Sequence, residues 1–231
     1  MSEQDGDAAR AATPVGDGNY TVRPGDGMSS IAERHGFFAD TLWNLPQNSA
    51  LKSARKSAEV LLPGDKVHVP ALRQKRESRP VDLVHQFKRK GVPVEIRFSV
   101  VEEGGRVFAD KAYILSIGQR RYEGRTDAKG ELHHWVSPAA HTGTLVVTLD
   151  EPGYPSKLVR ELRIGHLQPV ESIAGYQARL QNLGYFKGPV SGTETEATRA
   201  AIRRFQGAEE LDATGEADRA TLDALLARHG N

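Results

Sequence analysis

The sequence predicts a multidomain α+β protein, and three observations indicate this class. The chain has 231 residues, of which 26% are charged and 38% hydrophobic, so it can form more than one small domain. Apolar residues alternate with polar ones in residues 92–166, as in β-strands. From residue 167 to the end, apolar residues recur at three- and four-residue spacing, as in amphipathic helices.

Composition excludes several function classes. The formal net charge of +1 gives no general reason to expect nucleic-acid or membrane partners. The chain has no cysteine, which excludes disulfides, thiol catalysis and cysteine-based metal sites. No stretch approaches the ~18 consecutive apolar residues of a membrane span. We therefore expect no cofactor, no nucleic acid and no membrane among the partners.

The first 19 residues predict a disordered tail. They begin with an acidic stretch and lack the basic and apolar regions of a secretory signal. We expect a protein without a signal peptide, either cytoplasmic or exported by a non-Sec route to the periplasm or to a target cell wall.

Residues 20–70 predict a small domain that begins with a strand and a helix. Residues 20–22 form a short β-type run, and a Pro-Gly turn follows. Ser29 or Ser30 can cap a helix that stops at Gly36.

A second helix and a closing strand complete this domain. Asp40 or Thr41 can cap the helix, which should end near Pro46, because the residue before proline disfavours helical angles. Another Pro-Gly turn leads into an alternating strand at residues 66–69. The predicted order is strand, helix, helix, strand, with residues 49–59 as an insertion.

The opening of this domain, residues 20–32, and its close, residues 61–70, resemble a LysM module. The resemblance implies a βααβ fold and a shallow groove for N-acetylglucosamine glycans such as peptidoglycan or chitin. It places glycan contacts on the two loops that contain the Pro-Gly turns, where glycines let the backbone approach a sugar. The implied residues are Pro24, Gly25, Asp26, Gly27, Met28, Leu62, Pro63 and Gly64.

Residues 71–91 predict a basic linker. Its cations are Arg73, Lys75, Arg76, Arg79, Lys88, Arg89 and Lys90. Clustered Lys and Arg can bind phosphate or acidic partners. A solvated connector is favoured, because Phe87 is the single aromatic residue among the charges.

Residues 92–166 predict an antiparallel β-sandwich of six strands. Short alternating runs are separated by turns, including a tight turn at residues 126–130. This turn resembles those of transthyretin-like and Ig-like accessory domains, which implies a spacing or docking role.

Residues 167–231 predict three short helices around one core. Four segments, 176–186, 188–192, 198–206 and 211–215, resemble the three-helix peptidoglycan-binding domain found beside cell-wall hydrolases. The segment departs from that family at Ser191, where aspartate is usual. The resemblance implies a second wall-binding site at Tyr185, Phe186, Gly188, Ser191, Gly192 and Arg199.

Catalytic motifs are absent from the sequence. There is no HExxH helix, GxSxG elbow or glycine-rich phosphate loop. His133 and His134 are strand neighbours that face opposite ways and cannot chelate one ion. A hydrolase in the β-domain would have to use His133, His141 or Asp127, and Glu102 and Glu103 cannot flank one glycosidic bond.

The two tryptophans are candidates for sugar stacking. Core packing is favoured for Trp43, because it lies at helical spacing from Ala39, whereas Trp135 stays open between core packing and stacking.

Together these patterns predict a non-catalytic peptidoglycan-binding protein with two wall-directed modules. The alternative is a structural or adaptor component of a contractile injection system, either type VI secretion or a phage tail. Such a component would dock a spike or effector protein, with wall binding secondary.

Overall fold

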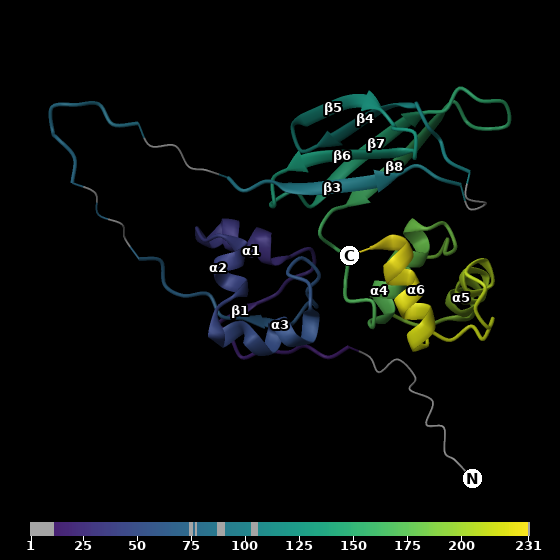
Figure 1. Cartoon of the computed structure of the whole chain (residues 1–231), viewed down its shortest axis with the longest axis horizontal. Coiled ribbons are helices and arrows are strands. Elements are labelled where there is room, and N and C mark those ends of the chain that lie inside the picture. Colours follow the sequence, from purple (N-terminus) through teal and green to yellow (C-terminus); the bar gives the residue numbers. More distant parts are fainter. Residues whose placement is uncertain (1–11, 74–75, 77, 87–90, 103–105, 231) are drawn as a thin grey trace, which may run out of the picture.

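The computed structural model describes residues 12–73, 76, 78–86, 91–102 and 106–230. Figure 1 shows an N-terminal unit of short helices, a central unit of β-strands and a C-terminal unit of helices. Each unit has its own cluster of buried apolar side chains. None of the helices in the described ranges is both long and apolar enough to cross a membrane.

The N-terminal unit contains one more α-helix than the sequence predicts. Its elements are β1 (Tyr20–Thr21), α1 (Met28–His35), α2 (Ala39–Trp43), the 3₁₀ turn η1 (Pro46–Asn48), α3 (Ser49–Arg55) and β2 (Lys66–Val67). Strands β1 and β2 pair antiparallel. Helix α3 fills the predicted insertion, and Leu51 on it joins the core.

The helix starts in this unit differ from the predicted caps. Gly27 is the N-cap of α1, and its N–H donates to the hydroxyl of Ser30 at 3.1 Å. Phe38 is the N-cap of α2, in place of Asp40 or Thr41. The predicted stop is confirmed, because Gly36 adopts a left-handed φ of 78°.

Residues 13–19 pack on this unit, which corrects the prediction of a disordered tail to residue 19. The N–H of Val15 donates to Asp65 Oδ1 at 2.8 Å, and the N–H of Lys66 donates to the Val15 carbonyl at 2.8 Å. The Asn19 side chain accepts from the N–H of Val69 at 2.8 Å and donates to its carbonyl at 2.9 Å. Backbone pairing and buried partners therefore fix this segment.

The central unit has two antiparallel sheets, as the alternating pattern predicts. The strands are β3 (Val94–Ser99), β4 (Ala112–Ile117), β5 (Arg120–Arg125), β6 (Glu131–Val136), β7 (Thr142–Thr148) and β8 (Lys157–Arg163). One sheet pairs β3 with β6, and the other has the order β5-β4-β7-β8. Residues such as Leu132 and Leu115 bring both sheets into one core.

The C-terminal unit contains α4 (Ile173–Asn182), α5 (Glu196–Ala208) and α6 (Arg219–His229). Their N-caps are Ser172, Thr195 and Asp218, and each side chain accepts a backbone hydrogen bond from the first turn. The apolar faces of the helices meet around Leu180 and Phe205, both fully buried. Helix spacing in the sequence therefore predicts this unit correctly.

Candidate functional site

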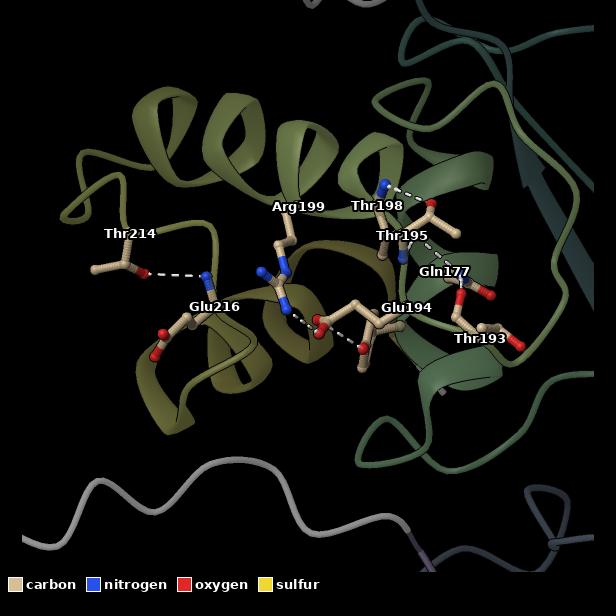
Figure 2. Close-up of polar contacts among 9 residues, drawn as sticks. Gln177, Thr193, Glu194, Thr195, Thr198, Arg199, Thr214 and Glu216 are labelled. Atoms are coloured by element: carbon tan, nitrogen blue, oxygen red, sulfur yellow. Dashed lines mark hydrogen bonds and ion pairs between the residues drawn. The ribbon is translucent and has the colours of Figure 1, made fainter.

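Gln177 on α4 fixes the loop that precedes α5. Its side chain is fully buried. Its Oε1 atom accepts from the N–H groups of Ser191 and Gly192 at 3.1 and 3.0 Å. Its Nε2 atom donates to the Thr193 carbonyl at 2.8 Å and to Thr198 Oγ1 at 3.0 Å. Figure 2 shows Gln177 beside Thr193, Thr195 and Thr198. The Gln177 side chain thus fixes the conformation of the loop before α5.

Gln206 on α5 repeats this arrangement for the loop that precedes α6. Its Oε1 atom accepts from the N–H of Gly215 at 2.9 Å. Its Nε2 atom donates to Thr214 Oγ1, the Glu216 carbonyl and Thr221 Oγ1 at 3.0, 3.0 and 2.8 Å. The sequences Ser-Gly-Thr-Glu-Thr at 191–195 and Thr-Gly-Glu-Ala-Asp at 214–218 occupy equivalent places. The unit is therefore built from two similar loop-to-helix turns.

Glu194 links α4 to α5 at the surface of this unit. Its carboxylate accepts from the Tyr176 hydroxyl at 3.2 Å and pairs with the Arg199 guanidinium at 3.3 Å. Figure 2 shows Arg199 directed at Glu194. Burial raises the pKa of Tyr176 well above its usual range, and the nearby Glu194 carboxylate raises it further. Tyr176 is therefore a neutral hydrogen-bond donor.

A half-open depression of about 280 Å³ lies between the loop after α4 and one face of α5. Its lining residues are Phe186, Lys187, Gly188, Ala197, Ala200 and Arg204. A Cβ on Gly188 would lie 2.7 Å from Cζ of Phe186, so a larger residue there would displace this ring. Arg204 and Lys187 are exposed, and Arg204 donates to the Tyr185 carbonyl. The depression is therefore apolar inside and positively charged at its rim.

The predicted residues of the second site divide between this depression and its supports. Phe186 and Gly188 line it. The Tyr185 ring packs edge-on against Phe205, with centroids 5.4 Å apart. Ser191, Gly192 and Arg199 serve the loop contacts described above and are not among the lining residues. The sequence prediction missed four lining residues, Lys187, Ala197, Ala200 and Arg204. Ala197, Ala200 and Arg204 recur at helical spacing, so the sequence does place them on one face of a helix.

Comparison with protein families identifies this unit. Residues 171–225 match the family model described as "Putative peptidoglycan binding domain". The C-terminal unit is a peptidoglycan-binding domain. Searches of curated proteins and of solved structures gave no match. The peptidoglycan-binding domain contains the depression and both glutamine-held loops, and it indicates peptidoglycan as the class of ligand.

The predicted glycan loops of the N-terminal unit are largely buried. Gly25, Asp26, Gly27, Met28 and Leu62 are all buried, whereas Pro63 and Gly64 are half-buried and Pro24 is exposed. A Cβ on Gly64 would lie 3.0 Å from Cγ of Pro14, and one on Gly27 would lie 2.5 Å from the Glu59 carboxylate. The glycines therefore face protein atoms of this same chain.

Asp26 is a structural residue of its loop. It accepts from the Tyr20 hydroxyl at 2.7 Å, from the N–H of Arg23 at 3.0 Å and from the Arg34 guanidinium at 3.0 Å. Burial alone would raise the pKa of Asp26, but these three donors outweigh burial and hold the pKa below its usual range. The carboxylate is thus ionised and saturated with partners.

Residues 165–168, which connect the central and C-terminal units, cover the first predicted glycan loop. A Cβ on Gly25 would lie 2.9 Å from Nε2 of His166 and 3.3 Å from Nδ1 of His141. The space between this connector and the two predicted glycan loops has a volume of only about 30 Å³. It is lined by residues 165–168 of the connector and by residues 24–26, 61 and 63. That volume admits about one water molecule. The loops cannot accept a sugar in this arrangement.

This covering contact predicts a pH dependence. Burial lowers the pKa of His166, and His141 and Arg163 lower it further. In the unfolded chain, histidine binds a proton near pH 6.5. A fall in pH below that value therefore stabilises the unfolded state relative to the folded state. We expect the urea midpoint to fall between pH 7 and pH 5.5, before ordinary carboxylates titrate. His166→Gln should reduce this fall, and an unchanged fall would contradict the contact.

The other candidate residues do not form a joint site. Asp127 accepts the N–H groups of Lys129 and Glu131, each at 2.8 Å, and so stabilises its own turn. Glu102 accepts from the Tyr154 hydroxyl at 2.8 Å, and Glu103 lies outside the described residues. Within the described ranges, no group of three or more His, Asp or Glu side chains could hold a metal ion. Trp43 is buried in the N-terminal core, as predicted.

Proposed function

We propose that this chain is a non-catalytic peptidoglycan-binding protein and that its C-terminal domain makes the main contact. The family match over residues 171–225 carries the proposal. The proposed contact is the depression between the loop after α4 and the face of α5.

The chemistry of the depression suits the peptide stems of the wall. Phe186 offers an apolar surface, and Ala197 and Ala200 leave space above the helix. Stem peptides combine small apolar side chains with carboxylates. Arg204 and Lys187 at the rim can pair with a carboxylate, and a guanidinium can do so with two parallel hydrogen bonds. A shallow site of this kind binds weakly by itself.

The N-terminal unit is proposed as a LysM-type second module. Its support is the paired β1 and β2 strands and the two Pro-Gly turns. Glycan binding there requires residues 165–168 to move away from Gly25. Two modest sites on one chain would act together on a repeating polymer through their effective concentration.

An adaptor role is the second candidate, and exposed apolar side chains in the linker between the N-terminal and central units favour it. Val81 is 97% exposed, Val84 is 93% exposed and Leu83 between them is 64% exposed, and exposed apolar side chains grouped in this way are typical of interaction sites. These residues could dock a spike or effector protein. The linker also contains three basic candidates for such docking, Lys88, Arg89 and Lys90, which lie outside the described residues. Val81→Asp with Val84→Asp should then abolish partner capture and leave wall binding unchanged.

Charge reversal in the depression tests the main proposal. Arg204→Glu should weaken pelleting of the full-length protein with purified sacculi about tenfold, because a charge-assisted hydrogen bond contributes about 1.5–3 kcal/mol. Arg219→Glu is the matched control, since it makes the same charge change on α6, and it should pellet like the wild type. Equal pelleting of both variants would place binding elsewhere.

A further inference from the structure

Trp135 is a large aromatic side chain on the outer face of a sheet. Strand β6 alternates, so that Leu132 and Val136 are buried and Trp135 points away from the core. Trp135 is 59% exposed, whereas Trp43 is 8% exposed. Tryptophan is highly buried on average, so this exposure calls for an explanation.

Polar side chains lie beside Trp135 on the same face of the sheet. Strand register places Glu95 of β3 opposite Trp135, and Arg97 opposite His133. Such cross-strand neighbours have Cβ atoms about 4.5–5.5 Å apart. The Arg97 guanidinium lies 3.7 Å from the Glu95 carboxylate. The surface is therefore one aromatic ring with hydrogen-bond donors and acceptors beside it, and not an apolar patch.

This combination matches the chemistry of a pyranose ring. A sugar presents C–H groups on its faces and hydroxyl or acetamido groups around its edge. An exposed indole has an apolar face that accepts the C–H groups, and neighbouring charged side chains can bind the polar edge. A protein partner would instead bury such a residue within a wider apolar core, which charged neighbours would weaken.

We propose that Trp135, with Glu95, Arg97 and His133, is a stacking platform for one pyranose of an N-acetylated glycan strand. The proposal rests on the proposed function, because the peptidoglycan-binding domain brings such strands to the same chain. The platform also lies near the N-terminal unit, since Ser137 donates to Glu33 of α1 at 3.3 Å. One glycan strand could thus contact the platform while the C-terminal domain holds a peptide stem.

Tryptophan fluorescence of the full-length protein tests this platform. The chain has two tryptophans, and Trp135 is the exposed one, so a hexamer of N-acetylglucosamine should change the emission of Trp135 and leave that of Trp43 unchanged. Trp135→Phe should abolish the change. Maltohexaose, which lacks acetamido groups, is the control sugar and should give a several-fold smaller response.

Pelleting with sacculi gives a second readout. Trp135→Ala should weaken pelleting about three- to tenfold, with an unchanged far-ultraviolet circular dichroism spectrum as evidence that the central unit still folds. No emission change on adding the hexamer, together with wild-type pelleting of Trp135→Ala, would overturn the platform. If Arg204→Glu still pellets normally while Trp135 responds to the hexamer, the C-terminal proposal fails and the platform stands.

Discussion

Replacing Asp65 by alanine is expected to destabilise the N-terminal unit by about 3–5 kcal/mol, because it leaves a buried arginine without its partner. Asp65 is fully buried, and the Arg55 side chain is only 7% exposed. The carboxylate accepts from Arg55 at 2.8 and 2.7 Å, and from the N–H groups of Val15 and Leu62 at 2.8 and 2.9 Å. One side chain thus joins α3, the last turn and the N-terminal segment.

Trp43 reports this change, since it lies in the core of the same unit. Urea unfolding followed by its emission, in a Trp135→Phe background, gives the free energy of unfolding. Asp40→Asn is the control, because Asp40 is exposed on α2, and it should shift the value by less than about 1 kcal/mol. A similarly small effect of Asp65→Ala would show that the network contributes little.

Gln206→Met should destabilise the C-terminal domain by about 2–4 kcal/mol. Methionine has a similar volume but offers no replacement for the amide. The change leaves the N–H of Gly215 and the hydroxyl of Thr221, both buried, without their present partners, and an unsatisfied buried group costs about 1–3 kcal/mol. The loop before α6 would then lose its fixed conformation.

Helical circular dichroism during thermal unfolding measures this effect. Gln181→Met is the control, because Gln181 is exposed on α4 and its side chain donates to the Gly188 carbonyl. It should cost about 0.5–1.5 kcal/mol at most. Equal effects of the two substitutions would mean that the buried amide does not organise the loop.

Residue spacing in the sequence correctly predicted those helices, strands and helix ends that depend mainly on neighbouring residues. The spacing of Leu180, Ile202 and Leu225 predicted the three C-terminal helices, because one face of each must be buried. Alternation in residues such as Tyr113 and Leu115 predicted the strands of the central unit. Gly36 ended its helix as expected, since its left-handed conformation costs glycine little.

Contacts between distant parts of the chain were not predictable in this way. His166 covers Gly25, and Pro14 covers Gly64, although neither pair is close in sequence. Gln177 and Gln206 look like ordinary surface amides in the sequence, yet both are fully buried. Arg204 was missed because its place beside Phe186 depends on how α5 packs on the preceding loop. Tertiary packing, and not local propensity, determines each of these positions.

The most direct test of wall binding is co-sedimentation of the full-length protein with purified peptidoglycan sacculi over a range of salt concentrations. We expect the protein to pellet, to remain bound at moderate salt, and to be released by soluble muropeptides that carry the stem carboxylates. Absence of pelleting, or pelleting that disappears at modest salt and is unaffected by muropeptides, would contradict peptidoglycan binding by this chain.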